Sequence, residues 1–292
     1  MGLERHDRLP GPMLKVDSHQ HFWIFDLVRD TWITEEMVNI RGDFLPDDLK
    51  PILDQNNVTA CVAVQADQSD AETAFLLDLA EKNSFIKGIV GWVDLRSADL
   101  REQLEHYRVF DKLKGFRHIV QAEEPGFMLE PAFLKGVAAL KDYGFTYDIL
   151  VGSSQIREAA KLVELNPGQN FVLDHLGKPP IKSREIHAWS ADIAELAAHE
   201  NVYCKLSGMV TEADPDNWRP AHLYPYMDIV LNAFGVRRVM FGSDWPVCKL
   251  AAEYDEVCDL TDSYLESLSV NEQELIWAGN AIKFYKLDIN EI

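Results

Sequence analysis

The sequence of 292 residues is poor in positive charge. Its 28 lysines and arginines stand against 48 aspartates and glutamates, which gives a formal net charge of −20. A surface this acidic repels phosphate backbones and anionic lipid headgroups. No apolar run approaches the roughly 18 residues that a membrane-spanning helix needs. We therefore expect no nucleic acid and no membrane as a partner, and the acidic balance favours a neutral small molecule as substrate.

Cysteine is also scarce and follows no pattern. The four cysteines are Cys61, Cys204, Cys248 and Cys258, and no two of them have CxxC spacing. The absence of CxxC spacing excludes a zinc knuckle and a thioredoxin-type motif. Sparse cysteines are typical of a reducing compartment, so we predict a cytoplasmic protein. Residues 1–12 are polar, without the apolar segment of a signal peptide, and we interpret them as a leader or an artificial extension before a single domain at 13–292.

Repeats and flexible linkers are absent too, which excludes a solenoid. Eight short runs rich in β-branched and aromatic residues predict strands at 15–22, 59–67, 86–94, 113–119, 146–151, 170–177, 202–208 and 238–247. Helical periodicity predicts helices at 71–82, 132–143, 156–165, 190–200, 254–268 and 272–285. This alternation predicts an α/β fold, a (β/α)8 TIM barrel. A doubly wound sheet is the alternative, but no glycine-rich phosphate turn follows the first strand.

Reactive side chains of such a barrel lie at the carboxyl ends of its strands. His19 and His21 are two residues apart on the first strand, so both imidazoles point the same way. Asp244 ends the last strand, which pairs with the first in a closed barrel, and closure therefore places it beside the two histidines. His175 adds a third imidazole from the sixth strand. Each residue alone is more simply explained as structural, whereas the four together favour a functional site.

A carboxylate among imidazoles is suited to general base catalysis. Asp244 can take a proton from water while the imidazoles polarise a carbonyl group or hold a metal ion. Arg117 can donate a fork of hydrogen bonds to substrate, or form an ion pair within this acidic chain. Lys205 needs a partner if it is buried, and a strand-end carboxylate would provide one. Trp32 and Tyr147 are our candidate substrate-binding aromatics, although most aromatic residues belong to the core.

An ordered set of motifs makes the chain similar to a known family. The set resembles the amidohydrolase-related (amidohydrolase 2) family, and within it the lactonases that act on sugar-acid lactones of the L-fuconolactone or L-rhamnonolactone type. The likeness runs from about residue 14 to the C-terminus. The motifs are VDSHQHFW, DFLPDDLKP, CVAVQADQSDAET, GIVGWVDL, LKGFRHIVQ, FVLDHLGKP, CKLSGMVTEAD, FGSDWPV and GNAIKFY.

The resemblance implies a distorted barrel that hydrolyses a sugar lactone to the aldonic acid. It assigns His19, His21, His175 and Asp244 to catalysis and to a single metal site, and Arg117 to substrate binding. The fourth and fifth strands lack the bridging lysine or glutamate and the histidine of the binuclear relatives. The resemblance therefore implies one divalent metal ion, zinc, or none.

Two other functions are compatible with this set of residues. The first is a metal-dependent decarboxylase of the same group, and the second is a sugar-acid-binding or inactive barrel. Assembly into a homo-oligomer is also open at this stage.

Overall fold

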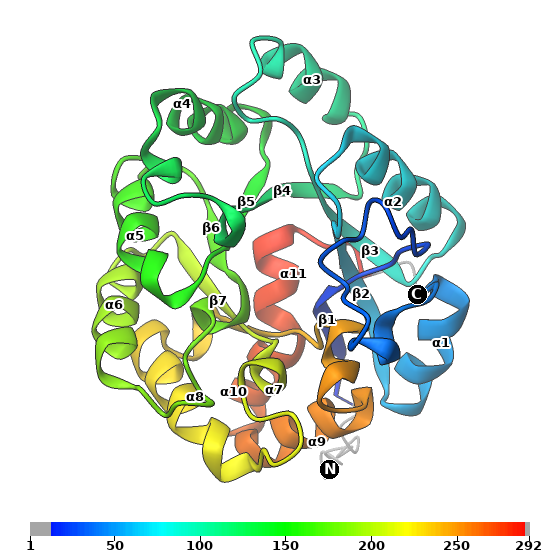
Figure 1. Cartoon of the computed structure of the whole chain (residues 1–292), viewed down its shortest axis with the longest axis vertical. Coiled ribbons are helices and arrows are strands. Elements are labelled where there is room, and N and C mark those ends of the chain that lie inside the picture. Colours follow the sequence, from blue (N-terminus) through cyan, green and yellow to red (C-terminus); the bar gives the residue numbers. More distant parts are fainter. Residues whose placement is uncertain (1–12, 290–292) are drawn as a thin grey trace, which may run out of the picture.

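The part of the chain that the computed structural model describes is residues 13–289, and it folds around one sheet of eight strands. Neighbouring strands are parallel and follow the order of the sequence. The strands are β1 (Lys15–Gln20), β2 (Val58–Val64), β3 (Ile86–Gly91), β4 (Leu113–Ile119), β5 (Thr146–Leu150), β6 (Phe171–Leu173), β7 (Val202–Leu206) and β8 (Val239–Phe241). Helices surround the strands (Figure 1), and the prediction of a (β/α)8 barrel is confirmed.

The helices follow the strands along the chain. They are α1 (Pro46–Gln55), α2 (Asp70–Lys82), α3 (Leu100–Tyr107), α4 (Pro131–Leu140), α5 (Ile156–Glu164), α6 (His187–Ala197), α7 (Met209–Glu212), α8 (Pro220–Phe234), α9 (Tyr254–Leu265), α10 (Val270–Glu274) and α11 (Asn280–Tyr285). The periodicity did not predict α1, α3, α7 and α8. Pro51 and Pro225 lie inside α1 and α8, where a proline ordinarily argues against a helix. None of the helices within 13–289 has the length and hydropathy to cross a membrane.

The last helices close one end of the barrel. The sequence predicted one helix at 272–285. The structure divides this segment into α10, a π-helical turn at Leu275–Gly279 and α11. Phe284 and Tyr285 of α11 pack in one cluster with the inward valines of the strands. The Lys114 side chain, near the start of β4, donates to the carbonyl oxygen of Lys286 at 3.2 Å. The amino ends of the strands are therefore covered by α11, which lies behind the centre of the barrel in Figure 1.

Most predicted strands end earlier in the structure than the sequence indicated, and two of them end four or more residues early. The predicted strands at 170–177 and 238–247 end at Leu173 and Phe241. The backbone then turns into the left-handed region at His175 (φ 52°) and at Asp244 (φ 59°). A non-glycine residue seldom adopts this conformation, and no local pattern predicts it. These turns direct both side chains over the carboxyl end of the barrel.

The barrel is closed by residues that follow β8. The amide of Asp244 donates to the carbonyl of His19 at 2.8 Å, and the amide of His21 donates to the carbonyl of Trp245 at 2.7 Å. We call this junction between β1 and the residues that follow β8 the seam. The buried carboxylate of Asp17 lies beside it. Its Oδ1 accepts from the amides of His19 and Ser243, and its Oδ2 accepts from the hydroxyls of Ser243 (2.6 Å) and Tyr254 (3.1 Å). The Asp17 carboxylate therefore joins the first strand to the residues after the last.

We expect Asp17→Ala to lower the free energy of unfolding by about 3 kcal/mol or more, because several buried donors lose their acceptor. Urea denaturation measures the loss. The control is Asp262→Ala, which removes a half-exposed carboxylate paired with Lys15 and should cost about 1 kcal/mol or less. Equal losses in the two variants would show that the Asp17 contacts do not hold the seam.

Candidate active site

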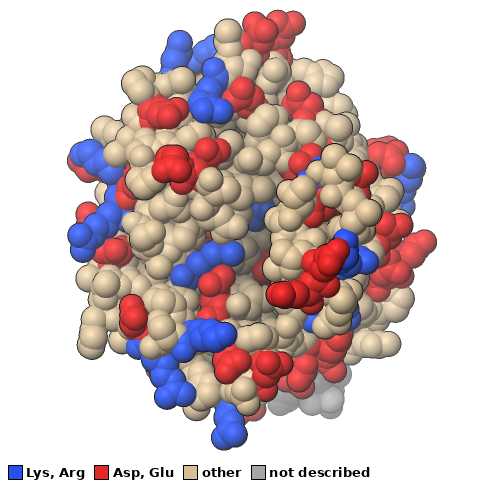
Figure 2. Space-filling model, in the orientation of Figure 1, with Lys and Arg blue, Asp and Glu red and all other residues tan. Residues whose placement is uncertain are grey.

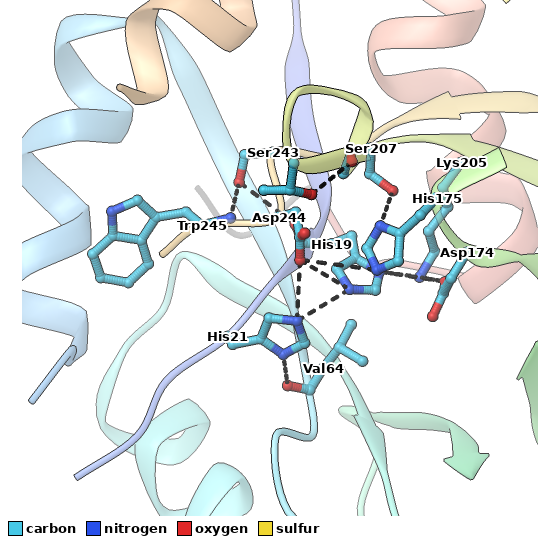
Figure 3. A network of polar contacts seen from close by, with 12 residues as sticks. His19, His21, Val64, Asp174, His175, Lys205, Ser207, Ser243, Asp244 and Trp245 are labelled. Carbon is cyan, nitrogen blue, oxygen red and sulfur yellow. Dashed lines mark hydrogen bonds and ion pairs between the residues drawn. The ribbon is translucent and has the colours of Figure 1, made fainter. Parts of the chain in front are cut away.

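The structure brings the four predicted residues together at the carboxyl end of the barrel (Figure 3). Asp244 Oδ1 lies 3.3 Å from His21 Nε2, 3.8 Å from His19 Nε2 and 3.9 Å from His175 Nε2. The Nε2 atoms of His19 and His21 are 3.2 Å apart. All four side chains are buried. A single carboxylate oxygen therefore faces three imidazole nitrogens.

The outer two imidazoles are held by groups from neighbouring strands. His21 Nδ1 lies 2.7 Å from the carbonyl oxygen of Val64 and donates its hydrogen there. His175 Nδ1 lies 2.9 Å from the hydroxyl of Ser207. A Cβ atom on Gly208 would come within 2.6 Å of the same nitrogen, and Gly208 has a φ of +62°. Only glycine leaves room there for the His175 ring.

A layer of buried charges lies beneath the imidazoles. Lys205 Nζ is 2.6 Å from Asp148 Oδ2, 3.0 Å from Asp174 Oδ1 and 3.1 Å from His19 Nδ1. The hydroxyl of Tyr285 donates to Asp148 Oδ2 at 2.7 Å. These side chains are almost entirely shielded from solvent. The sequence-based expectation that a buried Lys205 would pair with a carboxylate thus agrees with the contacts, and there are two such partners.

Arg117 completes this layer from the end of β4. Its Nη1 donates to Asp174 Oδ2 at 3.1 Å and lies 3.3 Å from His19 Nε2. Its Nη2 donates to the carbonyl oxygen of Gln65 at 2.5 Å, and the Gln65 amide donates back to the carbonyl oxygen of Arg117 at 3.1 Å. Of the two alternatives for Arg117, the ion pair is therefore present. The guanidinium is fixed beside the imidazole of His19.

Burial and neighbouring charges set the ionisation of the site. Burial lowers the pKa of His19 well below its ordinary value, although the nearby Asp174 carboxylate opposes the shift. Burial also lowers the pKa of His175 to about 4, against the pull of Asp244. For Asp244 burial alone would raise the pKa, but the imidazoles of His175 and His21 outweigh it and hold the pKa below its usual range. At neutral pH the cluster thus contains an ionised Asp244 carboxylate beside the neutral imidazoles of His19 and His175.

The spacing of the donor atoms fits one metal ion. Bonds of about 2.1 Å to a tetrahedral zinc ion would set the ligand atoms about 3.4 Å apart. The separations among His19 Nε2, His21 Nε2 and Asp244 Oδ1 are 3.2, 3.3 and 3.8 Å, and His175 Nε2 lies beyond them at 3.9 Å from the carboxylate. Nitrogen and carboxylate donors are also the ligands that zinc prefers. The geometry therefore fits a divalent metal ion, provided that each imidazole nitrogen is free of hydrogen.

The two candidate aromatic residues lie apart from the cluster. Trp32 is 42% exposed and packs edge-on against Trp23, whose ring centroid is 6.4 Å from that of His21. The face that Figure 2 shows is hollowed near its centre, over the barrel of Figure 1. Tyr147 is fully buried and packs on Phe133 and Phe171, in the cluster between strands and helices. Trp32 is thus connected to His21 through the ring of Trp23, whereas Tyr147 has no such contact with the histidines within the described residues.

Sequence reasoning missed several residues that shape the site. Tyr285 lies in the last helix, and nothing in its local sequence indicates that it reaches Asp148. Gly208 follows Lys205 and Ser207 in the motif KLSG, and a glycine after a barrel strand was the available signal. Asp174 directly precedes His175 in the motif FVLDHLGKP, and the sequence alone indicated no role for it.

The chain belongs to the amidohydrolase family, whose profile matches residues 16–287. It is 41% identical over 289 residues to the L-fucono-1,5-lactonase of Burkholderia multivorans, covering 94% of this chain and 96% of that one. It is 33% identical over 287 residues to the L-fucono-1,5-lactonase of Burkholderia ambifaria, with the same two coverages. The molecule is thus an enzyme of the amidohydrolase family.

Solved structures agree with this assignment. A crystal structure of an amidohydrolase from Burkholderia multivorans with bound zinc superimposes with a TM-score of 0.91 at 41% identity, covering 94% of this chain and 100% of that one. The 2,6-dihydroxybenzoate decarboxylase from Rhizobium superimposes with a TM-score of 0.66 at 15% identity, covering 94% of this chain and 99% of that one. The second likeness shows a shared fold alone.

Proposed function

We propose that this enzyme hydrolyses a sugar-acid lactone of the L-fucono-1,5-lactone type to the open aldonic acid, with Asp244 as the general base. The observation that carries the proposal is the ionised Asp244 carboxylate, which faces three imidazoles at the open end of the barrel. The L-fucono-1,5-lactonases at 41% and 33% identity support the substrate class. A neutral lactone is also compatible with the acidic surface of the chain.

The first step is the attack of water on the lactone carbonyl carbon. Asp244 takes a proton from the water as the new carbon–oxygen bond forms. The carbonyl oxygen gains negative charge as the bond forms. Hydrogen-bond donors of His19, His21 and Arg117, or a metal ion held beside them, would stabilise this charge. Such stabilisation is often worth about 3 kcal/mol for a single donor. His19, His21 and Asp244, with His175 as a further ligand, would hold a divalent ion, which would supply a Lewis acid there.

The second step opens the ring. The bond between the former carbonyl carbon and the ring oxygen breaks, and the protonated Asp244 returns its proton to that oxygen, which becomes a hydroxyl group of the product. His175 orients the carboxylate for both transfers, and Ser207 in turn orients His175 through the contact to Nδ1. Because a lactone is an activated ester, the base need not be strong. The proton of the water is thus conserved through the cycle.

A panel of lactones tests the substrate class. We expect acid release, read with a pH indicator, from L-fucono-1,5-lactone and with lower efficiency from L-rhamnonolactone, because the lactonases above act on the former. Reactions without enzyme correct for spontaneous opening of the lactones. Silence across the whole panel, together with carbon dioxide release from a dihydroxybenzoate, would instead favour the decarboxylase.

Asp244→Asn tests the base. The amide keeps the shape of the side chain but cannot take a proton from water, so kcat should fall by about 10²-fold or more. Asp262→Asn makes the same change at a half-exposed surface position and should leave kcat unaltered. Thermal unfolding of both variants shows whether the fold survives. A rate near that of the wild type in Asp244→Asn would remove the proposed role.

Gly208→Ala tests the placement of His175. The new methyl group would lie 2.6 Å from His175 Nδ1 and should displace the ring, and a misplaced catalytic group costs about 10²-fold in rate. Gly144→Ala is the matched control, since Gly144 also has a positive φ (+81°) but nothing within 4 Å of its Cβ position. Both variants should lose about 1–2 kcal/mol of stability from the left-handed backbone. Equal activities of the two would contradict the role of His175.

A further inference from the structure

Tyr285, at the end of α11, contacts both members of the buried ion pair that lies beneath the imidazoles. Its hydroxyl donates to Asp148 Oδ2 at 2.7 Å, and Lys205 Nζ lies over its ring, 5.5 Å from the ring centroid. An ammonium group within about 6 Å of a ring centroid is attracted to the face of the ring. All three side chains are buried. Tyr285 therefore supports the ion pair from the closed end of the barrel, on the side away from the imidazoles.

The position of Asp148 depends on two donors. Its Oδ2 accepts from Lys205 Nζ at 2.6 Å and from the Tyr285 hydroxyl, whereas its Oδ1 makes no hydrogen bond with any of residues 13–289. A buried carboxylate is costly unless donors compensate for the water that it has lost. Without the Tyr285 hydroxyl, Lys205 would be the single remaining donor among these residues. The Asp148 carboxylate would then be held less firmly.

Lys205 connects the position of Asp148 to the active site. Its Nζ lies 3.0 Å from Asp174 Oδ1 and 3.1 Å from His19 Nδ1, in addition to its contact with Asp148. The other oxygen of Asp174 accepts from Arg117 at 3.1 Å. An ammonium group that moves with Asp148 changes its distance to the imidazole and to Asp174 together. This dependence holds whichever nitrogen of the His19 ring carries the hydrogen.

The helix that carries Tyr285 is anchored at both ends. At its start, the Asn280 side chain donates to the carbonyl oxygen of Val239 in β8 at 2.6 Å. Just after its end, the carbonyl oxygen of Lys286 accepts from the Lys114 side chain of β4 at 3.2 Å. Two different strands of the barrel thus hold α11 in place, and Tyr285 is a fixed support for the ion pair.

We infer that Tyr285 is a positioning residue of the active site. Through Asp148 and Lys205 it holds the imidazole of His19 and the Asp174 carboxylate where the structure places them, because the ion pair lies between Tyr285 and these two groups. Its effect on the reaction rate rests on the lactone hydrolysis proposed above, whereas its effect on the position of Lys205 does not. The catalytic end of the barrel is thus set in part from the closed end.

The first test is Tyr285→Phe, which removes the hydroxyl and keeps the ring. We expect kcat for the lactone to fall about tenfold, the lower end of what loss of an outer partner costs a site, with KM unaltered because Tyr285 lies beneath the ion pair. Tyr264→Phe is the matched control, since that hydroxyl also donates to an aspartate, Asp228 Oδ1 at 2.8 Å, but between α8 and α9. Urea denaturation checks that both variants fold. An unchanged kcat in Tyr285→Phe, or equal losses in the two variants, overturns the inference.

The second test asks whether the hydroxyl acts through Asp148. Asp148→Asn alone should lower kcat by about tenfold or more. Adding Tyr285→Phe to it should lower kcat no further, because residues that act as one unit do not contribute independently. Losses that multiply in the double variant overturn the inference. If Tyr285→Phe does not fold, Asp148→Asn alone decides, since a wild-type kcat in that variant means that Tyr285 cannot act through Asp148.

The third test needs no substrate and observes Lys205 by NMR. In the full chain labelled with ¹⁵N in its lysines, exposed ammonium groups exchange hydrogen with water too fast to be seen at neutral pH, whereas a buried and hydrogen-bonded ammonium group gives a signal. The signal of Lys205 is identified by its through-space contacts with the ring of residue 285, which the phenylalanine variant keeps. We expect faster exchange and a shifted ¹⁵N frequency in Tyr285→Phe, and neither change in Tyr264→Phe.

This measurement separates the inference from the proposed function. If the wild-type protein opens none of the lactones, the proposed function fails and the Lys205 signal alone judges the role of Tyr285. A Lys205 signal that Tyr285→Phe leaves at the wild-type frequency and exchange rate overturns the inference, whatever substrate the enzyme takes.

Discussion

The chemistry of this molecule depends on the seam at which the last strand meets the first. β8 has only three residues, and the contacts that complete the barrel come from Asp17, Ser243 and the backbone around Asp244. The same seam places the Asp244 carboxylate against His19 and His21, which lie more than two hundred residues away in the sequence. Closing the fold and assembling the site are therefore one event. A loss of the seam would open the barrel and separate the acid from the imidazoles together.

The balance of buried charge distinguishes Asp244 from the other carboxylates. Burying an ion costs several kcal/mol unless a partner compensates, which makes a buried ionic layer a poor source of stability. Asp148 and Asp174 are matched by Lys205 and Arg117, at 2.6–3.1 Å. Within residues 13–289, the Asp244 carboxylate faces the imidazoles of three histidines and lies within ion-pair distance of no lysine or arginine. Of these three carboxylates, Asp244 is thus the one whose charge is not matched by a lysine or an arginine.

The sequence predicted the parts of the site that follow from regular geometry. The two-residue period of a strand predicted that His19 and His21 share a side, and barrel closure predicted their meeting with Asp244. It did not predict the parts that depend on irregular backbone or distant packing. The left-handed turn at His175 shortened its strand, and Tyr285 reaches Asp148 only because α11 covers the far end of the barrel. Residues 1–12, interpreted as a leader or an artificial extension, lie outside the described part of the chain.

The charged layer also bears on how many metal ions the site can hold. His19, Asp174 and His175 form a second group whose donor atoms lie within 4.8 Å of one another, beside the group of His19, His21 and Asp244. A second ion there would need Asp174 as a ligand, but Lys205 lies 3.0 Å from one of its oxygens and Arg117 donates to the other. The charged side chains of Lys205 and Arg117 thus already pair with both oxygens of Asp174. In the group of His19, His21 and Asp244, by contrast, no lysine or arginine within residues 13–289 forms an ion pair with the carboxylate.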